Sequence, residues 1–205
     1  MKTKILTTLM LLSALLTVHG AAQISTGPVS MQPERATELS YTYSTLRTNA
    51  PVGGCGCFWN SGGSVELAVP LWRHFSSVTE FSGEHAGSIP GNSGTALSLI
   101  SALAGVRMTR PVNKKLFPFA QGLIGVVHAF DSYFPGSLGP TTSATSFALA
   151  TGGGIDVAVS PRWLVRPIQV EYQFMHLPNN AGNEQHDIRL SAGIVLRFFR
   201  NSSRK

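Results

Sequence analysis

Four of the six histidines are the residues whose chemistry is most suggestive in this chain. His176 and His186 bracket one polar segment that also contains Glu184, and Asp187 follows directly. Imidazoles beside carboxylates occur in metal sites and in acid–base catalysis. The catalytic hypothesis for this chain is a lipid-modifying hydrolase. The sequence contains neither a Gly-x-Ser-x-Gly nor a His-Glu-x-x-His motif, so we predict no catalytic, metal-binding or cofactor-binding residue. The four histidines are His85, His128, His176 and His186.

The two cysteines, Cys55 and Cys57, are separated by one residue in a glycine-rich segment. Two thiolates are too few for a structural zinc site, and no further ligands follow at zinc-like spacing. In an oxidising compartment the pair can form a strained ring, bond to another chain or remain as thiols. We predict a disulfide in preference to redox chemistry.

Charged side chains also recur at alternate positions of long segments, most clearly between Trp163 and Phe199. This stretch predicts two strands joined by the polar loop Leu177–Asn183. In the second strand Ile188 and Leu190 share one face, whereas Arg189 belongs to the other, because side chains alternate along a strand. Strands of about ten or more residues exceed the usual length in soluble sheets and match a tilted bilayer crossing. The stretch is therefore typical of a membrane β-barrel hairpin.

The N-terminus has the form of an export signal. Lys2 and Lys4 precede the apolar run Ile5–Val18, and the small residues Gly20–Ala22 follow it. That run is shorter than the roughly 20 residues of a membrane-spanning helix. We predict a signal peptide at 1–22, a periplasmic lead-in at 23–35, an outer-membrane barrel at 36–200 and a C-terminal tail at 201–205.

Composition is consistent with a surface that faces lipid. Only 13% of the residues are charged, against about 25% in ordinary soluble domains. The chain has 16 basic and 10 acidic residues, but the basic ones are scattered, without a stripe or a recognised nucleic-acid motif. We therefore expect no nucleic-acid partner.

Six further alternating segments precede the hairpin, which gives eight strands. Their connections are predicted at 49–62, 72–74, 85–94, 110–115, 131–144, 160–162 and 177–183, alternately long and short. Outer-membrane barrels have short periplasmic turns and longer extracellular loops. The predicted fold is all-β, an eight-stranded antiparallel up-and-down transmembrane β-barrel, with the four histidines at the extracellular ends. Basic residues expected at the periplasmic rim, within reach of lipid phosphates, are Arg73, Arg110, Lys114, Lys115, Arg162, Arg166 and Arg200.

Alternation alone does not say which face points inward. A soluble barrel of the lipocalin type would enclose Ile188, Leu190 and Ile194 and bind an apolar ligand. We favour the inverse arrangement, with the apolar face toward lipid and the polar face inside. The polar face is rich in small residues and isolated charges, and aromatic residues recur on the apolar face near strand ends. These aromatic residues are Tyr41, Tyr43, Tyr172, Phe174 and Phe198.

Charges confined to a narrow barrel must be paired, because an isolated buried charge is very costly. We predict a closed polar network that plugs the lumen, with acids and bases roughly balanced; a gated proton or ion path is the alternative. For strand five, roughly 116–130, the alternation is too poor to assign faces. The predicted interior residues are Glu66, Glu80, Arg107, Asp156, Gln169, Glu171, Gln173, Arg189 and Arg197.

Several segments resemble small outer-membrane β-barrel domain proteins of the OmpA/OmpX-like class: Gly152–Val157, Arg166–Tyr172, Asp187–Val195, Gly105–Arg107 and Pro118–Gln121. The resemblance covers essentially the whole chain after the signal and consists of strand patterns. It implies an eight-stranded barrel in the outer membrane of a Gram-negative cell. It also implies folding by the outer-membrane assembly machinery, whose signal is a last strand that closes on an aromatic residue, here Phe198–Phe199.

We therefore expect a non-enzymatic, plugged outer-membrane protein that stabilises the envelope or presents surface loops. The alternatives are an outer-membrane lipid-modifying enzyme that uses rim histidines with a loop serine, and a soluble periplasmic ligand carrier. The expected partners are outer-membrane lipids and, during folding, the assembly machinery. The chain is expected to be a monomer without cofactors.

Overall fold

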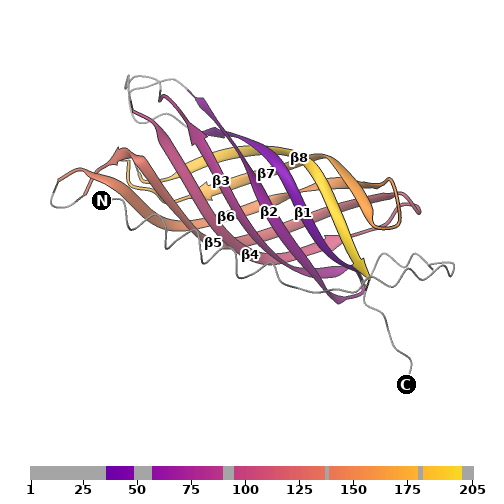
Figure 1. Ribbon diagram of the computed structural model, residues 1–205. Coiled ribbons are helices and arrows are strands. Elements are labelled where there is room, and N and C mark those ends of the chain that lie inside the picture. The colour runs from indigo at the N-terminus through magenta and orange to yellow at the C-terminus, as the bar shows by residue number, and fades with distance from the viewer. Residues whose placement is uncertain (1–35, 49–56, 90–94, 137–138, 180–181, 200–205) are drawn as a thin grey trace, which may run out of the picture. The chain divides into compact units, whose positions relative to one another are not determined.

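Eight long strands form one closed antiparallel barrel in the computed structural model, which describes residues 36–48, 57–89, 95–136, 139–179 and 182–199. Each strand pairs with its neighbour in sequence, and β8 closes the barrel against β1 (Figure 1). The predicted fold is confirmed. Among the described residues no helix is long and apolar enough to cross a membrane. The strands are β1 (Ala36–Thr48), β2 (Phe58–Trp72), β3 (Phe75–Ala86), β4 (Leu97–Thr109), β5 (Leu116–Phe134), β6 (Thr141–Ala158), β7 (Trp163–Met175) and β8 (Gln185–Phe199).

The two ends of the barrel differ in their connections. The turn end has the connections 73–74, 110–115 and 159–162, and here the start of β1 pairs with the end of β8. The loop end has the connections 49–57, 87–96, 135–140 and 176–184.

Two predicted loops are shorter than expected. The third long loop, 131–144, is wrong over most of its length, since β5 and β6 continue as a ladder to the pair Phe134 and Thr141. The connection 135–140 is consequently no longer than the turn 110–115, so the predicted alternation of loop lengths fails there. The first loop ends earlier than predicted, because Phe58–Gly62 already pairs with β1. Polar and glycine-rich residues suggested loops in both places, but a backbone ladder does not depend on side-chain polarity.

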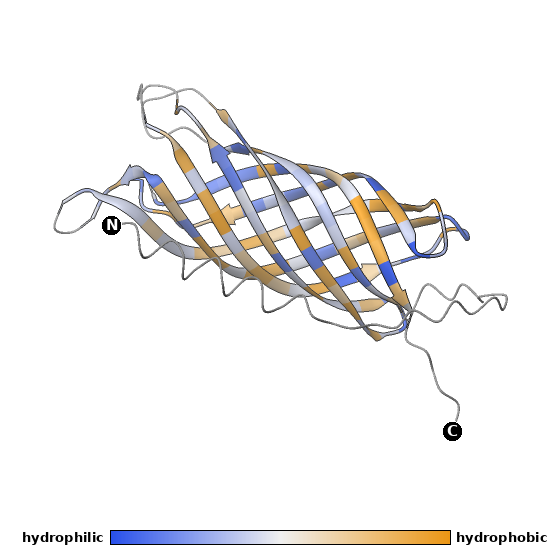
Figure 2. Ribbon diagram, viewed as in Figure 1, coloured by the Kyte–Doolittle hydropathy of each residue, from blue (hydrophilic) through white to orange (hydrophobic). Residues whose placement is uncertain are grey.

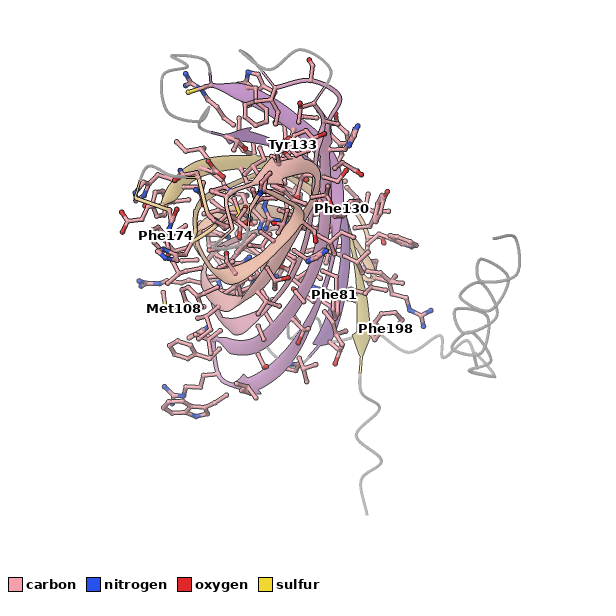
Figure 3. All side chains as sticks on the ribbon, turned by 90° about the vertical axis from the view of Figure 1, so that its left-hand side faces the viewer. Phe81, Met108, Phe130, Tyr133, Phe174 and Phe198 are labelled. Atoms are coloured by element: carbon pink, nitrogen blue, oxygen red, sulfur yellow. The ribbon has the colours of Figure 1, made fainter. Side chains whose placement is uncertain are left out.

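The outer wall is apolar and the lumen is polar, which overturns the lipocalin-like alternative. On β8, Ile188 and Ile194 expose 49% and 47% of their surface, whereas Arg189, which follows Ile188 in the chain, is fully buried. Hydrophobic and hydrophilic residues alternate along the strands (Figure 2), and Met108, Phe174 and Phe198 lie outside the ring of strands (Figure 3). The exposed apolar area that these side chains form is larger than a soluble monomer ordinarily presents. They include Leu39, Tyr41, Tyr43, Val65, Leu67, Phe81, Ile100, Val106, Ile124, Val126, Ile168, Val170 and Leu190.

The lumen is filled in layers. At the turn end Phe117, Leu164 and Val195 pack together. Most of the larger apolar cluster comes from strand ends at the loop end, and the charged residues lie between. An eight-stranded barrel has an interior just wide enough for side chains to fill. The larger cluster contains Leu46, Phe58, Ala68, Val78, Ala86, Ile89, Leu97, Leu99, Leu103, Leu123, Val127, Ala129, Phe134, Ala148, Ala150, Met175 and Leu177.

The polar lumen as candidate functional site

One carboxylate, that of Glu66 on β2, lies between two guanidinium groups. Arg166 donates from Nη1 to Glu66 Oε1 at 3.1 Å, and Arg107 forms a close ion pair with the same oxygen. Arg166 also forms a two-point pair with Asp156, with Nε–Oδ1 at 2.7 Å and Nη2–Oδ2 at 3.1 Å. The ring of Phe119 lies against both guanidinium groups, 4.1 Å from that of Arg107 and 4.5 Å from that of Arg166. We call Arg107, Arg166, Glu66 and Asp156 the Arg107 cluster; it holds two cations and two anions.

A second group of charges surrounds Arg189 on β8. Its Nε donates to Glu171 Oε2 at 2.9 Å, its Nη2 pairs with Glu80, and its Nη1 lies 3.5 Å from Glu84 Oε1. Glu84 also accepts from Ser82 Oγ at 3.1 Å and Ser44 Oγ at 3.3 Å. This Arg189 cluster, formed by Arg189, Glu80, Glu84 and Glu171, holds one cation and three carboxylates.

Gln121 on β5 joins the two clusters. Its Oε1 accepts from Arg107 Nε at 2.9 Å, while its Nε2 donates to Glu66 Oε2 at 3.2 Å and to Glu171 Oε1 at 2.8 Å. With Ser40 donating to Glu66 at 3.0 Å, the connected network draws side chains from all eight strands. A closed ring of such contacts ties non-adjacent strands together across the lumen.

The predicted interior residues are all buried, and most of them belong to this network. Gln169 accepts from Arg166 Nη1 at 2.8 Å. The Gln173 amide faces Arg189, and its oxygen comes within 3.2 Å of Nε and Nη1 when turned toward them. Arg197 lies apart at the turn end, where its Nε donates to Glu38 Oε1 at 2.7 Å. The expected balance of charge holds in the Arg107 cluster but not in the Arg189 cluster.

Arg166 corrects one prediction, because it was expected at the lipid-facing rim and is instead buried in the lumen. The pairing of β7 with β8 shifts register between Arg166 and Gln169. Pro167 and Ile168 both face outward there, so Arg166 and Gln169 both face inward although they are three positions apart. Such an irregularity reverses the parity of a strand. Pro167 is the one sequence signal that could have indicated it.

Other inward-facing residues were missed. Gln121 and the apolar residues Leu123 and Val127 lie on β5, the strand whose faces were not assigned. Glu84 shares the parity of Glu80 but was left out of the predicted set. Toward the loop end, apolar residues line a small cavity beside Glu84 and Gln173. The expectation that the oily face lies outside and the charged face inside is therefore incomplete, since the lumen also contains an apolar layer.

The comparisons with known proteins agree with this architecture. No family model and no curated protein matches the sequence. The structure of Neisserial surface protein A superposes with a TM-score of 0.63 at 15% identity, over 79% of this chain and 97% of that one. Ail of Yersinia pestis gives 0.53 at 18% identity, over 80% and 99% of the two chains. OprG of Pseudomonas aeruginosa gives 0.51 at 9% identity, over 81% and 97%. This chain has the fold of the small outer-membrane β-barrel proteins.

His85, His176 and His186 lie at or next to the loop-end termini of β3, β7 and β8. His128 was expected at such an end but lies inside β5, which continues to Phe134, and the four histidines are not gathered into one site. Among the described residues no ring contact or hydrogen bond joins His176 to His186. His186 instead bonds to Tyr172 through Nδ1, lies against Phe174, and has Nε2 3.8 Å from Glu184 Oε2. His128 bonds to Thr145 Oγ1 at 2.7 Å. No group of three or more His, Cys, Asp or Glu side chains in the described part of the chain could hold a metal ion.

His85 is part of an arrangement that contains a serine and an acid. Ser98 Oγ donates to Asp131 Oδ2 at 2.7 Å, and His85 Nδ1 lies 2.9 Å from the same Oγ. A serine nucleophile needs its proton directed at the histidine, with the acid on the far side of the ring. Here Asp131 bonds to the serine hydroxyl and not to the imidazole, so the order of groups does not match a catalytic triad.

The remaining predicted positions lie near the barrel ends. Arg73, Arg110, Lys114, Lys115 and Arg162 are exposed at the turn end. Arg200 lies outside the described residues. Cys57 is exposed just before β2, and Cys55 lies outside the described residues, so the disulfide stays a prediction.

Proposed function

We propose that this chain is a non-enzymatic outer-membrane β-barrel whose lumen is plugged by the Arg107 and Arg189 clusters, and that it stabilises the envelope or presents its loops outside the cell. The observation that carries the proposal is the network that reaches all eight strands through Gln121. A water-filled channel would separate these side chains, whereas the network holds them in contact across the lumen.

The apolar outer wall supports a position in the membrane. Every backbone group of a closed barrel is paired within the protein, which satisfies the main requirement for strands in lipid. Barrels of this class place short turns in the periplasm and longer loops outside. By that rule the turn end faces the periplasm and the loop end the exterior. Outer-membrane lipids are then the principal partners, and the assembly machinery acts during folding.

A role without catalysis is supported by the geometry at the loop end. The histidines belong to different strands and loops, and in the His85–Ser98–Asp131 arrangement the acid bonds to the serine hydroxyl and not to the imidazole. No specific observation favours the lipid-modifying alternative.

Two measurements test the proposal. The protein should stay in the membrane fraction after a high-salt wash, require detergent for extraction and migrate differently on gels before and after heating. In planar lipid bilayers it should show no steady ion current. A variant that combines Glu80→Ala, Glu171→Ala and Arg189→Ala removes most of the Arg189 cluster and should produce a measurable current if it remains folded. Recovery without detergent, or a steady current through the unaltered protein, would contradict the proposal.

A further inference from the structure

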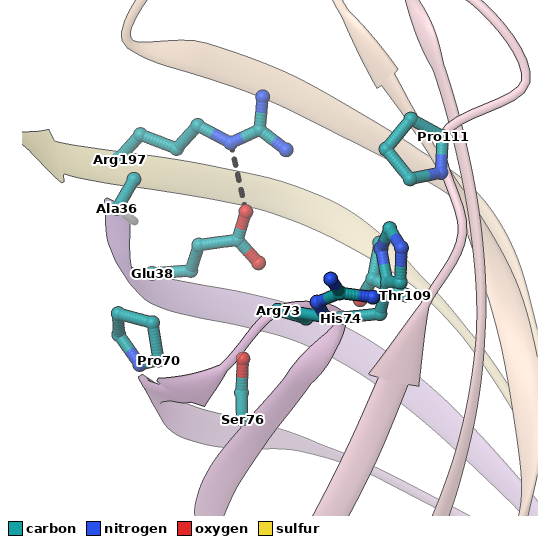
Figure 4. A pocket seen from close by; sticks show the side chains of 9 residues that line it. All are labelled: Ala36, Glu38, Pro70, Arg73, His74, Ser76, Thr109, Pro111 and Arg197. Carbon is teal, nitrogen blue, oxygen red and sulfur yellow. Dashed lines mark hydrogen bonds and ion pairs between the residues drawn. The ribbon is translucent and has the colours of Figure 1, made fainter. Parts of the chain in front are cut away.

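The turn-end mouth of the lumen contains a cavity unlike the rest of the interior. It is partly open to the outside and is lined from β1, β2, β3, β4, β8 and two of the turns (Figure 4). Basic and hydroxyl side chains dominate this lining, whereas the Arg189 cluster has an excess of carboxylates. The lining residues are Ala36, Glu38, Pro70, Arg73, His74, Ser76, Thr109, Pro111 and Arg197.

Arg197 provides a buried cation with unused hydrogen-bonding capacity. Only 5% of its surface is exposed, and its guanidinium group lies 4.3 Å from the centre of the Phe117 ring. Its Nε donates to Glu38, and the structure shows no other hydrogen bond of this group to a described residue. Buried polar groups are ordinarily hydrogen-bonded, so a ligand in the cavity would supply the partners that the two terminal amino groups lack among the described residues.

Arg73 provides a second cation that the backbone holds in place. It occupies the left-handed region, with φ of 42°, in the two-residue turn between β2 and β3. A residue other than glycine pays about 1–2 kcal/mol in this region, and such strain often accompanies a functional role. The turn is fixed to the neighbouring strand by a bond of 2.8 Å from Thr109 N to His74 O. The backbone of this turn is therefore fixed, and the exposed side chain of Arg73 lines the cavity from it.

The chemistry of the cavity matches an anion that accepts several hydrogen bonds. Arg73 and Arg197 face it with one carboxylate, Glu38, which leaves an excess of one positive charge. The hydroxyl groups of Ser76 and Thr109 add two neutral donors. Guanidinium groups bind phosphate oxygens in pairs, and exposed basic residues at the same end raise the local concentration of anions.

We propose that the turn-end mouth binds a phosphate group, with Arg73 and Arg197 as its principal ligands and Glu38 as an internal competitor for Arg197. The group belongs either to a soluble phosphate monoester or to a lipid headgroup, which share this chemistry. The proposal concerns the folded barrel alone and stands whether or not the lumen conducts.

Titration of the full folded chain in micelles of a non-ionic sugar detergent, which contain no phosphate, tests the site. Inorganic phosphate and glycerol 3-phosphate are added at constant ionic strength, and calorimetry or amide chemical shifts report binding. Saturable one-site binding is expected. Arg73→Gln and Arg197→Gln should each weaken it about tenfold, the effect of one lost charged hydrogen bond. Glu38→Gln should strengthen it, because it frees Arg197 from its present partner.

Arg110→Gln and Arg162→Gln serve as matched controls, since both residues are exposed at the same end and do not line the cavity. Each should change the affinity less than about twofold, as a screened surface charge does. Heat-modifiable migration verifies that every variant is folded, and Arg73→Gln and Glu38→Gln decide the matter if Arg197→Gln fails to fold.

The source of the phosphate is separated by a second arm. Saturation by free glycerol 3-phosphate identifies a soluble ligand. Amide shifts at the cavity that appear on transfer from these micelles to phospholipid nanodiscs, without added glycerol 3-phosphate, identify a headgroup. No saturable binding in either arm, equal losses in the control variants, or weaker binding by Glu38→Gln would overturn the proposal.

Discussion

The charged residues of the lumen pair in two different ways. In the Arg107 cluster, Glu66 balances two guanidinium groups together with Asp156. In the Arg189 cluster, three carboxylates share one guanidinium, and Glu80 Oε2 is buried without a partner among the described residues. A carboxylate that compensates two cations is harder to replace than one of three around a single cation.

Replacement of the two glutamates by glutamine should therefore have unequal effects. Glu66→Gln leaves an uncompensated buried cation and should lower the free energy of unfolding by about 3–5 kcal/mol. Glu80→Gln removes one of the three negative charges around Arg189 and should lower the free energy of unfolding by less than about 1 kcal/mol. Urea unfolding in lipid vesicles, followed by tryptophan fluorescence, measures both. Equal losses would show that the two clusters do not differ in this way.

Local features of single strands allow the large charged side chains to fit inside the closed barrel. The parity reversal at Pro167 brings Arg166 to Asp156 and Glu66. On β6, Gly152 makes room for the neighbouring strand: a Cβ atom there would lie 2.1 Å from Val170 O and 2.8 Å from Glu171 Cγ. Gly152 thus permits close packing against β7, as expected for glycine inside a strand.

Gly152→Ala should consequently destabilise the barrel by about 1–3 kcal/mol, because an added methyl group in a packed interior must displace its neighbours. Gly122 on β5 is the matched control, since nothing lies within 4 Å of a Cβ atom placed there. Gly122→Ala should be neutral or slightly stabilising. The same urea unfolding measures both variants, and a Gly152→Ala barrel as stable as Gly122→Ala would refute the close-packing role.

The barrel as a whole is inverted relative to a soluble protein, with its charges enclosed and its oily residues outside. Exposed apolar area of this extent is stable only against another apolar phase. In a bilayer, the cost of a charge on the outer wall depends on depth, being largest near the midplane and small at the interfaces.

This depth dependence gives a test of membrane insertion. Ile194 lies on the outer wall of β8 in a pair with Tyr41, away from either barrel end, whereas Val112 is exposed in a turn. Ile194→Lys should lower the free energy of unfolding in lipid vesicles by about 2–4 kcal/mol. Val112→Lys should change it by less than about 0.5 kcal/mol, as most surface substitutions do. A similar small effect at both positions would mean that the outer wall does not contact hydrocarbon.

The sequence by itself determined the number and order of the strands, because a period of two is a local property of the chain, but it did not determine where β2, β5 and β6 begin or end. It also indicated which parity of most strands carries charge, as for Arg189 between Ile188 and Leu190. It did not determine the parity of β5, where apolar residues occupy both faces, or of β7 beyond the irregularity at Pro167.

Only the tertiary structure decided which charges meet. Arg166 pairs with Glu66 across 100 positions of the chain, and Arg189 with Glu80 across 109. Alternation assigns a side chain to a face, but its level in the lumen depends on the tilt and stagger of the closed barrel. The same closure brings Arg197 of β8, Glu38 of β1 and Arg73 of a turn to one cavity.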